Sequence, residues 1–248
     1  MAEQSHQKKP NNMKIKSFNT RSDGYKIEGN IHFPVNHQSA PCVICSHGLF
    51  SSKESSKFIA MTEQLTGEGF VAVRYDHRGC GASEGKIEET TVSDRLKDLD
   101  SILRFVGQRF PSTRKIGLFG SSMGGYISLL KAAQTPLISA VVVWATPYKL
   151  GRTRSDYNEE GYPLLKKRFY EDLNNHNLLN MLSRIKRCFV LHGQKDELVP
   201  VRHATMIYEN LSNPKKMEIF PGGDHRFSDE TIRNRAIELS IKFFKNHL

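Results

Sequence analysis

The sequence predicts a doubly wound, mostly parallel α/β sheet of about eight strands with a small helical lid insertion. Three observations lead to this fold class. Short apolar runs alternate with amphipathic segments, the runs are apolar at consecutive positions as in strands covered on both faces, and a hairpin signal precedes the alternation. At 248 residues with 38% hydrophobic content, the chain is long enough for one substantial core, so we expect a single domain.

The expected strands begin with an antiparallel hairpin. Two strands, near residues 14–19 and 25–33, flank the turn signal Arg21-Ser22-Asp23-Gly24. Later apolar runs are typical of buried parallel strands, and the expected strands are 43–44, 70–75, 116–119, 140–144, 188–191 and 217–220.

Helices are expected between these strands because apolar residues recur there at helical spacing. In the segment 96–110, Leu96, Leu99, Leu103 and Val106 form one stripe. The other expected helices are 58–66, the segment that follows Gly124, 201–211 and 230–248.

Domain boundaries follow from where this alternation stops. Residues 1–12 are polar and are expected to form a disordered tail. Residues 13–146 and 186–248 would form the core domain. The segment 147–185 separates two expected strands at the carboxyl edge of the sheet, where a long insertion usually covers a ligand site. We therefore interpret it as a lid, with a surface helical decoration as the alternative.

Charge, apolar content and cysteine spacing indicate which partners, location and metal binding to expect. The formal net charge is +10, from 36 Lys and Arg against 26 Asp and Glu, but the basic residues are scattered and no nucleic-acid module appears, so no nucleic-acid partner is expected. No apolar stretch approaches the roughly 20 residues that span a bilayer, and the N-terminus lacks a signal-peptide core, so a cytoplasmic location is expected. Cys42 and Cys45 have C-x-x-C spacing within an apolar run, which favours packing over a metal site, and no metal is expected.

The motif Gly120-Ser121-Ser122-Met123-Gly124 is the strongest functional signal. It follows the apolar run 116–119 and precedes a helical pattern, so strand, sharp turn and helix come in the order that projects a serine hydroxyl above a sheet. The glycines are expected because larger side chains would clash in so tight a turn. Ser122 is therefore the candidate nucleophile.

A serine hydroxyl needs a base and an acid to activate it, and loops after two later strands supply candidates. Asp196 follows the strand 188–191, and His225 follows the last strand. Glu197 is the main rival acid, and Asp224 is interpreted as a turn or cap residue because it is adjacent to the histidine. The other histidines, among them His192, His203 and His32, are interpreted as surface or packing residues.

An acyl-transfer transition state also needs two N–H donors for its oxyanion. Met123 follows the nucleophile at a helix N-terminus, and its backbone N–H is the first candidate. The loop His47-Gly48-Leu49-Phe50 is expected to give the second donor, with Leu49 preferred and Phe50 as the alternative, and His47 is expected to orient this loop.

Four motifs together resemble the α/β-hydrolase superfamily, from about residue 25 to the C-terminus: His47-Gly48, the segment 76–83, Gly120 to Gly124, and Asp196 with His225. The chain looks like the bacterial carboxylesterases that include cinnamoyl and feruloyl esterases, and like the serine aminopeptidase and monoacylglycerol-lipase-like group. The resemblance implies an α/β-hydrolase fold, a Ser-His-Asp triad and no cofactor. In such proteins the segment 76–83 shapes a turn, and Cys80 stands where a bulkier residue is common.

The expected function is that of a serine carboxylesterase acting on a small-molecule ester through an acyl-enzyme intermediate. An acyl-CoA thioesterase or a serine peptidase with the same triad, and a non-catalytic binder on this fold, are the alternatives. A homodimer is left open. Residues expected to contact substrate are Phe50, Tyr148, Tyr157, Tyr162 and Phe169, although aromatic residues in a lid equally suit a small core of its own.

Overall fold

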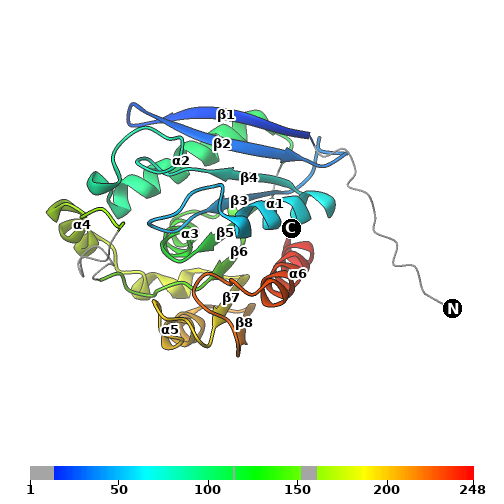
Figure 1. Ribbon diagram of the computed structural model, residues 1–248. Coiled ribbons are helices and arrows are strands. Elements are labelled where there is room, and N and C mark those ends of the chain that lie inside the picture. The colour runs from blue at the N-terminus through cyan, green and yellow to red at the C-terminus, as the bar shows by residue number, and fades with distance from the viewer. Residues whose placement is uncertain (1–13, 114, 152–160) are drawn as a thin grey trace.

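The computed structural model describes residues 14–113, 115–151 and 161–248 (Figure 1). Its centre is one eight-stranded sheet with the order β1-β2-β4-β3-β5-β6-β7-β8. The strands are β1 (Lys14–Ser22), β2 (Tyr25–Phe33), β3 (Cys42–Ser46), β4 (Val71–Tyr75), β5 (Ile116–Ser121), β6 (Ile138–Trp144), β7 (Cys188–Gly193) and β8 (Lys215–Phe220). The predicted fold class is confirmed.

The leading hairpin is the antiparallel part of the sheet. β1 pairs with β2, and β2 pairs with β4, in antiparallel register, whereas all later pairs are parallel. The turn between β1 and β2 consists of Asp23 and Gly24, with φ of 47° and 87°. Two positive φ values give the tight turn that matches strand twist. The turn is therefore shorter than predicted, because Arg21 and Ser22 belong to β1.

Helices cover both faces of the sheet (Figure 1). They are α1 (Ser56–Gly67), α2 (Val92–Arg109), α3 (Met123–Gln134), α4 (Lys167–Asp172), α5 (Arg202–Asn210) and α6 (Glu230–His247), with short 3-10 turns η1 (Ile87–Glu89), η3 (Leu173–Asn175) and η4 (Leu179–Arg184). The start of α2 lies earlier than predicted, because the Thr91 side chain caps the helix by accepting from the Asp94 N–H.

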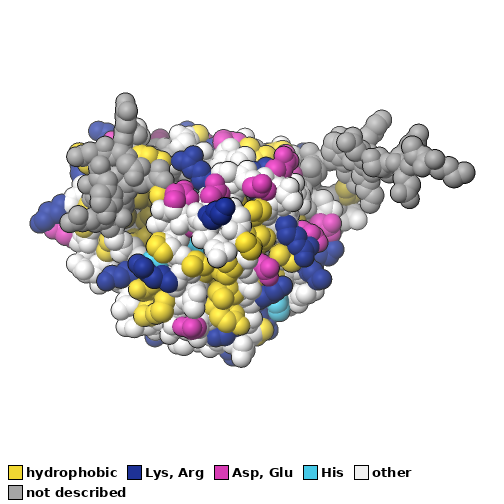
Figure 2. All heavy atoms as spheres, turned by 60° about the horizontal axis from the view of Figure 1, so that its bottom comes forward, with side chains coloured by type: hydrophobic (Ala, Val, Ile, Leu, Met, Phe, Trp, Pro, Cys, Tyr) yellow, Lys and Arg dark blue, Asp and Glu magenta, His cyan; other side chains and the backbone are white. Residues whose placement is uncertain are grey.

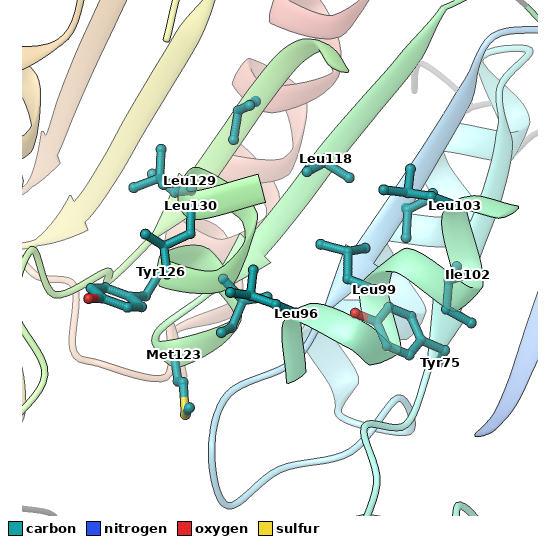
Figure 3. Close-up of a cluster of buried hydrophobic side chains, with 14 of the residues drawn as sticks. Tyr75, Leu96, Leu99, Ile102, Leu103, Leu118, Met123, Tyr126, Leu129 and Leu130 are labelled. Atoms are coloured by element: carbon teal, nitrogen blue, oxygen red, sulfur yellow. The ribbon is translucent and has the colours of Figure 1, made fainter. Parts of the chain in front are cut away.

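Two hydrophobic clusters lie on opposite faces of the sheet. The larger contains the α2 stripe, which packs with α3 and β5 as Figure 3 shows for Leu96, Leu99, Leu118 and Tyr126. The smaller is built from α1, α6 and the other face of the strands. Strand residues feed both clusters because successive side chains point to opposite faces. Both faces of the inner parallel strands β3 to β7 are thus buried over most of their length, as the continuous apolar runs predicted, whereas the edge strand β8 is mostly half-buried.

The segment 147–185 is tied to the core by polar contacts in its described part. Asp172 of α4 accepts hydrogen bonds from the Ser93 hydroxyl (2.6 Å) and the Ser93 N–H (2.8 Å) at the start of α2. Lys166 pairs with Glu89 at 2.6 Å. The predicted tail 1–12 and the predicted contact residue Tyr157 lie outside the described residues. Among the residues that the structure describes, no helix is long and apolar enough to cross a bilayer.

Candidate active site

Ser122 lies at the sharp turn between β5 and α3. Its backbone has φ 56° and ψ −126°, and its N–H donates to the Trp144 carbonyl at 2.9 Å. A side chain at Gly124 would collide with the carbonyl oxygens of Ser46 and His47, and one at Gly120 would collide with the backbone of Gly124. The two glycines are required by close packing, as predicted, and the serine is held in a strained backbone conformation that favours a functional role.

Asp196 and His225 meet across two loops at the carboxyl edge of the sheet. The His225 Nδ1 lies 3.0 Å from Asp196 Oδ1 and 2.9 Å from Oδ2. Glu197, the rival acid, instead accepts from the backbone N–H of His225 at 3.1 Å. Asp224 accepts from the Ser228 N–H at 2.8 Å and so stabilises its own turn. The structure therefore pairs the imidazole with Asp196.

The Asp196 carboxylate is fixed from several sides. Its Oδ1 also accepts from the backbone N–H groups of Leu198 and Val199, at 2.9 and 2.7 Å. Burial alone would raise its pKa, but hydrogen bonds from His192 and His225 and from the Val199 N–H outweigh that effect and hold the pKa of Asp196 well below its usual range. Asp196 is an anion at neutral pH, and it can orient a histidine and stabilise the imidazolium form.

His192, which was interpreted as a surface or packing residue, is fully buried and also contacts Asp196. Its Nε2 lies 2.7 Å from the Val199 carbonyl and 3.2 Å from Asp196 Oδ2. Because a carbonyl can only accept, Nε2 must carry a proton and donate. The sequence interpretation missed this role, although the i, i+4 spacing of His192 and Asp196 at a strand end was a signal for it.

The loop after β3 approaches the nucleophile closely. A Cβ placed on Gly48 would lie 3.4 Å from the Ser122 Cβ, in van der Waals contact, so the backbone of this loop lies directly beside the nucleophile. Within the described part of the chain, the N–H groups of Leu49 and Met123 have no hydrogen-bond acceptor. Both residues line the same cavity as Ser122. Two free donors beside a serine are what an oxyanion requires.

His47 is buried beneath this loop and has no access to substrate. Its Nδ1 lies 2.7 Å from the Gly48 carbonyl, and its Nε2 accepts from the His77 N–H at 3.0 Å. Burial lowers the pKa of His47 well below its usual range, and the neighbouring His77 and Arg95 add to that effect. His47 is therefore a neutral residue that orients the loop, as expected from the sequence.

Comparison with known proteins assigns the family. A family model described as serine aminopeptidase, S33 (Hydrolase_4), matches residues 37–187, which is more than half of the chain. The chain belongs to this family. It is an α/β hydrolase, and its curated relatives include a thioesterase.

The similarity to known proteins covers most of this S33-family hydrolase. The mouse mitochondrial palmitoyl-protein thioesterase ABHD10 is 29% identical over 215 residues, which cover 77% of this chain and 70% of the relative. The Est1E structure from Butyrivibrio proteoclasticus with bound ferulic acid has a TM-score of 0.80 at 20% identity, covering 92% of this chain and 99% of that one. The esterase Pf2001 from Pyrococcus furiosus has a TM-score of 0.78 at 22% identity, covering 95% and 93%. These two structures share the fold.

The hydrolase has a cavity of about 920 Å³ that contains both Ser122 and His225. Of the residues predicted to contact substrate, Phe50, Tyr162 and Phe169 line it. The Phe50 and Tyr162 rings meet edge to face at 5.0 Å, which joins the loop after β3 to the segment 147–185. Tyr148 is not among the lining residues, and its ring packs on His203 at 4.8 Å.

Arg95 holds the loop after β3 in place, and this role was not found by sequence reasoning. This α2 residue is fully buried, and its guanidinium donates to the carbonyls of Gly48 (3.3 Å) and Leu49 (3.0 Å). The same group reaches the Cys80 sulfur at 3.5 Å, which links the turn at 76–83 to the loop. Holding both carbonyls against Arg95 fixes the peptide planes that carry the following N–H groups.

The turn at 76–83 of this hydrolase is held together, and joined to Lys53, by hydrogen bonds to Asp76. Asp76 accepts from the Lys53 N–H at 2.7 Å, from the Lys53 ammonium at 2.6 Å and from the Ala82 N–H at 2.9 Å. None of these contacts involves the cavity serine. The observed contacts agree with the turn-shaping role that the resemblance implied.

Cys42 and Cys45 pack on opposite faces of β3. They belong to different hydrophobic clusters because their separation is an odd number of residues. Burial raises the pKa of the Cys42 thiol to about 12 and shifts that of Cys45 in the same direction. This spacing therefore serves packing in the hydrolase core.

Proposed function

We propose that this hydrolase cleaves small-molecule carboxylic esters with Ser122 as nucleophile, His225 as base and Asp196 as the orienting acid. The observation that carries the proposal is the Asp196–His225 pair at 2.9 Å, which opens onto the cavity that also contains Ser122. With its Nδ1 proton held by a carboxylate, the imidazole presents Nε2 as the basic atom.

In the proposed reaction, Ser122 Oγ attacks the ester carbonyl while His225 Nε2 accepts the hydroxyl proton. The tetrahedral oxyanion is stabilised by the N–H groups of Met123 and Leu49. The ester C–O bond then breaks, and the imidazolium returns the proton to the leaving alcohol. Water, deprotonated by the same nitrogen, then adds to the acyl-enzyme carbonyl. The bond between the acyl carbon and Ser122 Oγ breaks, the imidazolium returns the proton to Oγ, and the carboxylic acid is released.

The remaining parts of the cavity would define the substrate. Phe50, Tyr162 and Phe169 give it an apolar wall that suits an acyl or aryl group. The segment 147–185 would act as a lid, because Tyr162 and Phe169 belong to it. A homodimer and a cytoplasmic location remain predictions, and the mouse relative is named as mitochondrial.

A thioester is the second candidate substrate. The mouse relative, at 29% identity, is named as a palmitoyl-protein thioesterase. The same serine, histidine and oxyanion donors would serve thioester cleavage, because a thiolate leaves more readily than an alkoxide.

Two measurements test the proposal. A fluorophosphonate should label the protein at one serine, identified by mass spectrometry as Ser122, and Ser122→Ala should abolish labelling and lower turnover by at least about 10⁴-fold. Ser112→Ala, which changes an exposed serine, is the matched control and should keep both. Loss of less than about tenfold in Ser122→Ala would show that the nucleophile is misassigned.

Initial rates on a panel of substrates distinguish esterase, thioesterase and peptidase activity. The panel contains p-nitrophenyl esters from acetate to palmitate, methyl ferulate, acyl thioesters and aminoacyl amides. Ester turnover that depends on Ser122 supports the proposal. Exclusive cleavage of thioesters or of amides would replace it by a thioesterase or a peptidase, and binding without turnover would indicate a non-catalytic protein.

A further inference from the structure

Positive side chains dominate the charged lining of the cavity. Lys57, Lys149, Arg226 and Arg233 line it, whereas Glu197 is the carboxylate among the described lining residues. The Glu197 carboxylate already accepts the His225 N–H. On the face seen in Figure 2, by contrast, basic side chains are scattered among acidic and apolar ones. Basic side chains are therefore concentrated in the cavity, whereas they are mixed with acidic side chains on that face.

Lys57 is the most buried of these cations. It stands near the start of α1, is 9% exposed, and its Nζ donates to the Ser121 hydroxyl at 3.0 Å. Burial lowers its pKa to about 8, and nearby charges act on it in both directions: Asp224 and Asp196 raise the pKa, and Arg226 and Arg233 lower it. At neutral pH the amine is mainly protonated, so a buried cation faces the cavity.

Two other buried lysines show what a purely structural lysine looks like in this fold. Lys53 pairs with Asp76 at 2.6 Å, and Lys131 pairs with Asp100 at 2.7 Å. No carboxylate of a described residue lies within ion-pair distance of Lys57. Burying a charge without a counterion is costly. Lys57 interacts with Asp224 and Asp196 only at longer range, and the lack of a direct ion pair distinguishes it from both structural lysines.

Further donors line the same cavity as Lys57. Ser55 and Ser56 at the start of α1 also line the cavity, the Ser55 side chain does not cap the helix, and the first turn contains no acidic residue. The Nε of Arg233 is buried and has no hydrogen-bond partner. An ammonium, a guanidinium N–H and an uncapped helix N-terminus together favour a bound anion.

From this arrangement we propose that the natural substrate is an ester or thioester that carries a carboxylate or phosphate group, which binds at Lys57 with Arg233 and the start of α1. The proposal rests on the proposed function and names its substrate class. Lys57, Ser121 and Ser122 line one cavity, and the Lys57 ammonium donates to the hydroxyl of Ser121, the residue before the nucleophile. The anionic group would therefore bind in the same cavity as the reacting ester.

The test compares esters that differ only in terminal charge. The neutral substrate is p-nitrophenyl valerate, the carboxylate substrate is mono-p-nitrophenyl glutarate, and the phosphorus analogue is p-nitrophenyl 4-phosphonobutanoate. The readout is the ratio of kcat/KM for each anionic ester to that for the neutral ester. The larger of the two ratios identifies which anion the subsite prefers.

Lys57→Met removes the charge at similar side-chain length and should lower the anionic-to-neutral ratio by about 10- to 100-fold, in line with the loss of one charged hydrogen bond. Lys57→Arg should retain most of the preference. Lys186→Met is the matched control for net charge, because Lys186 is exposed and precedes β7 at the opposite edge of the sheet. It should leave the ratio unchanged. The same ratio in wild type and Lys57→Met would overturn the proposal.

A binding measurement keeps this test separate from the proposed reaction. If no substrate shows turnover that depends on Ser122, the proposed function fails, and the subsite is then tested by calorimetric titration of the Ser122→Ala protein with glutarate and with inorganic phosphate. Binding that disappears in the Ser122→Ala, Lys57→Met double variant supports an anion subsite. Binding of neither anion, or equal binding by both proteins, excludes it. Circular dichroism and melting temperatures show that each variant is folded.

Discussion

The Arg95 guanidinium donates to the Leu49 carbonyl at 3.0 Å across 46 residues of sequence. This contact connects α2 to the loop that lies against Ser122. Arg95 is fully buried, and its position is set by the helix stripe that packs Leu96 and Leu99 onto the sheet. The hydrophobic packing of α2 therefore determines the geometry of a loop in the candidate active site.

Arg95→Met should lower kcat by about 10- to 100-fold with little change in KM. The loss follows because Arg95 also holds the Gly48 carbonyl, whose peptide plane carries the Leu49 N–H, so that this N–H would no longer be held toward the oxyanion. Single oxyanion donors contribute on the order of 10²-fold or more to kcat. Steady-state kinetics on one ester measure both constants. Arg95→Lys should recover part of kcat, and Arg104→Met, an exposed change on the same helix, should have no effect. An equal rise in KM with constant kcat would argue against a positioning role.

Asp196→Asn should lower kcat by about 10³- to 10⁴-fold, because an amide can hold the imidazole in the wrong tautomer and cannot stabilise its charged form. Glu197→Gln should cost less than about tenfold, because Glu197 contacts the backbone of His225 and not its ring. Comparison of kcat for the two variants assigns the acid. Similar losses in both would mean that the acids share the role.

The buried Asp98 cluster predicts a loss of stability in acid. Burial would raise the pKa of Asp98, but hydrogen bonds and charge from His77 and Arg78 outweigh it and hold the pKa at about 2, against 3.8 for the free group. A depressed pKa stabilises the fold above about pH 4, and that contribution, about 2 kcal/mol, disappears as pH falls from about 4 to 2. The deficit in free energy of unfolding of Asp98→Asn relative to wild type should therefore shrink over this range. Urea unfolding at pH 7, 4 and 3 measures it, and a deficit constant with pH would contradict the assignment.

Two glycine-to-alanine changes should have opposite effects on stability. Gly124→Ala should destabilise the protein and lower turnover, because its Cβ would collide with the backbone of the loop after β3. Gly107→Ala lies in α2 with open space around the added methyl group, and it should stabilise the fold by about 0.5–1 kcal/mol through helix propensity. Thermal or urea unfolding of both variants checks this pair. Stabilisation by Gly124→Ala would refute the close packing at the nucleophile turn.

The candidate site contains residues whose burial or role is not predicted by sequence patterns. Lys57 and Arg95 are charged residues in amphipathic segments, where such positions usually face water, yet both are buried here. His192 was interpreted as a surface or packing residue, but it also contacts Asp196. Each of these roles depends on partners from other elements, and a local pattern contains no information about them.

The sequence by itself determined the succession of strands and helices along the chain. It also determined the strand-turn-helix around Ser122 and the carboxyl-end loops that hold Asp196 and His225. These features are local, because hydrophobic periodicity and turn chemistry act over a few residues. The tertiary structure alone decided which acid faces His225, which cation holds the loop at Leu49 and which lysine enters the cavity. Those outcomes depend on strand order and helix packing, which bring residues distant in the chain within hydrogen-bond distance.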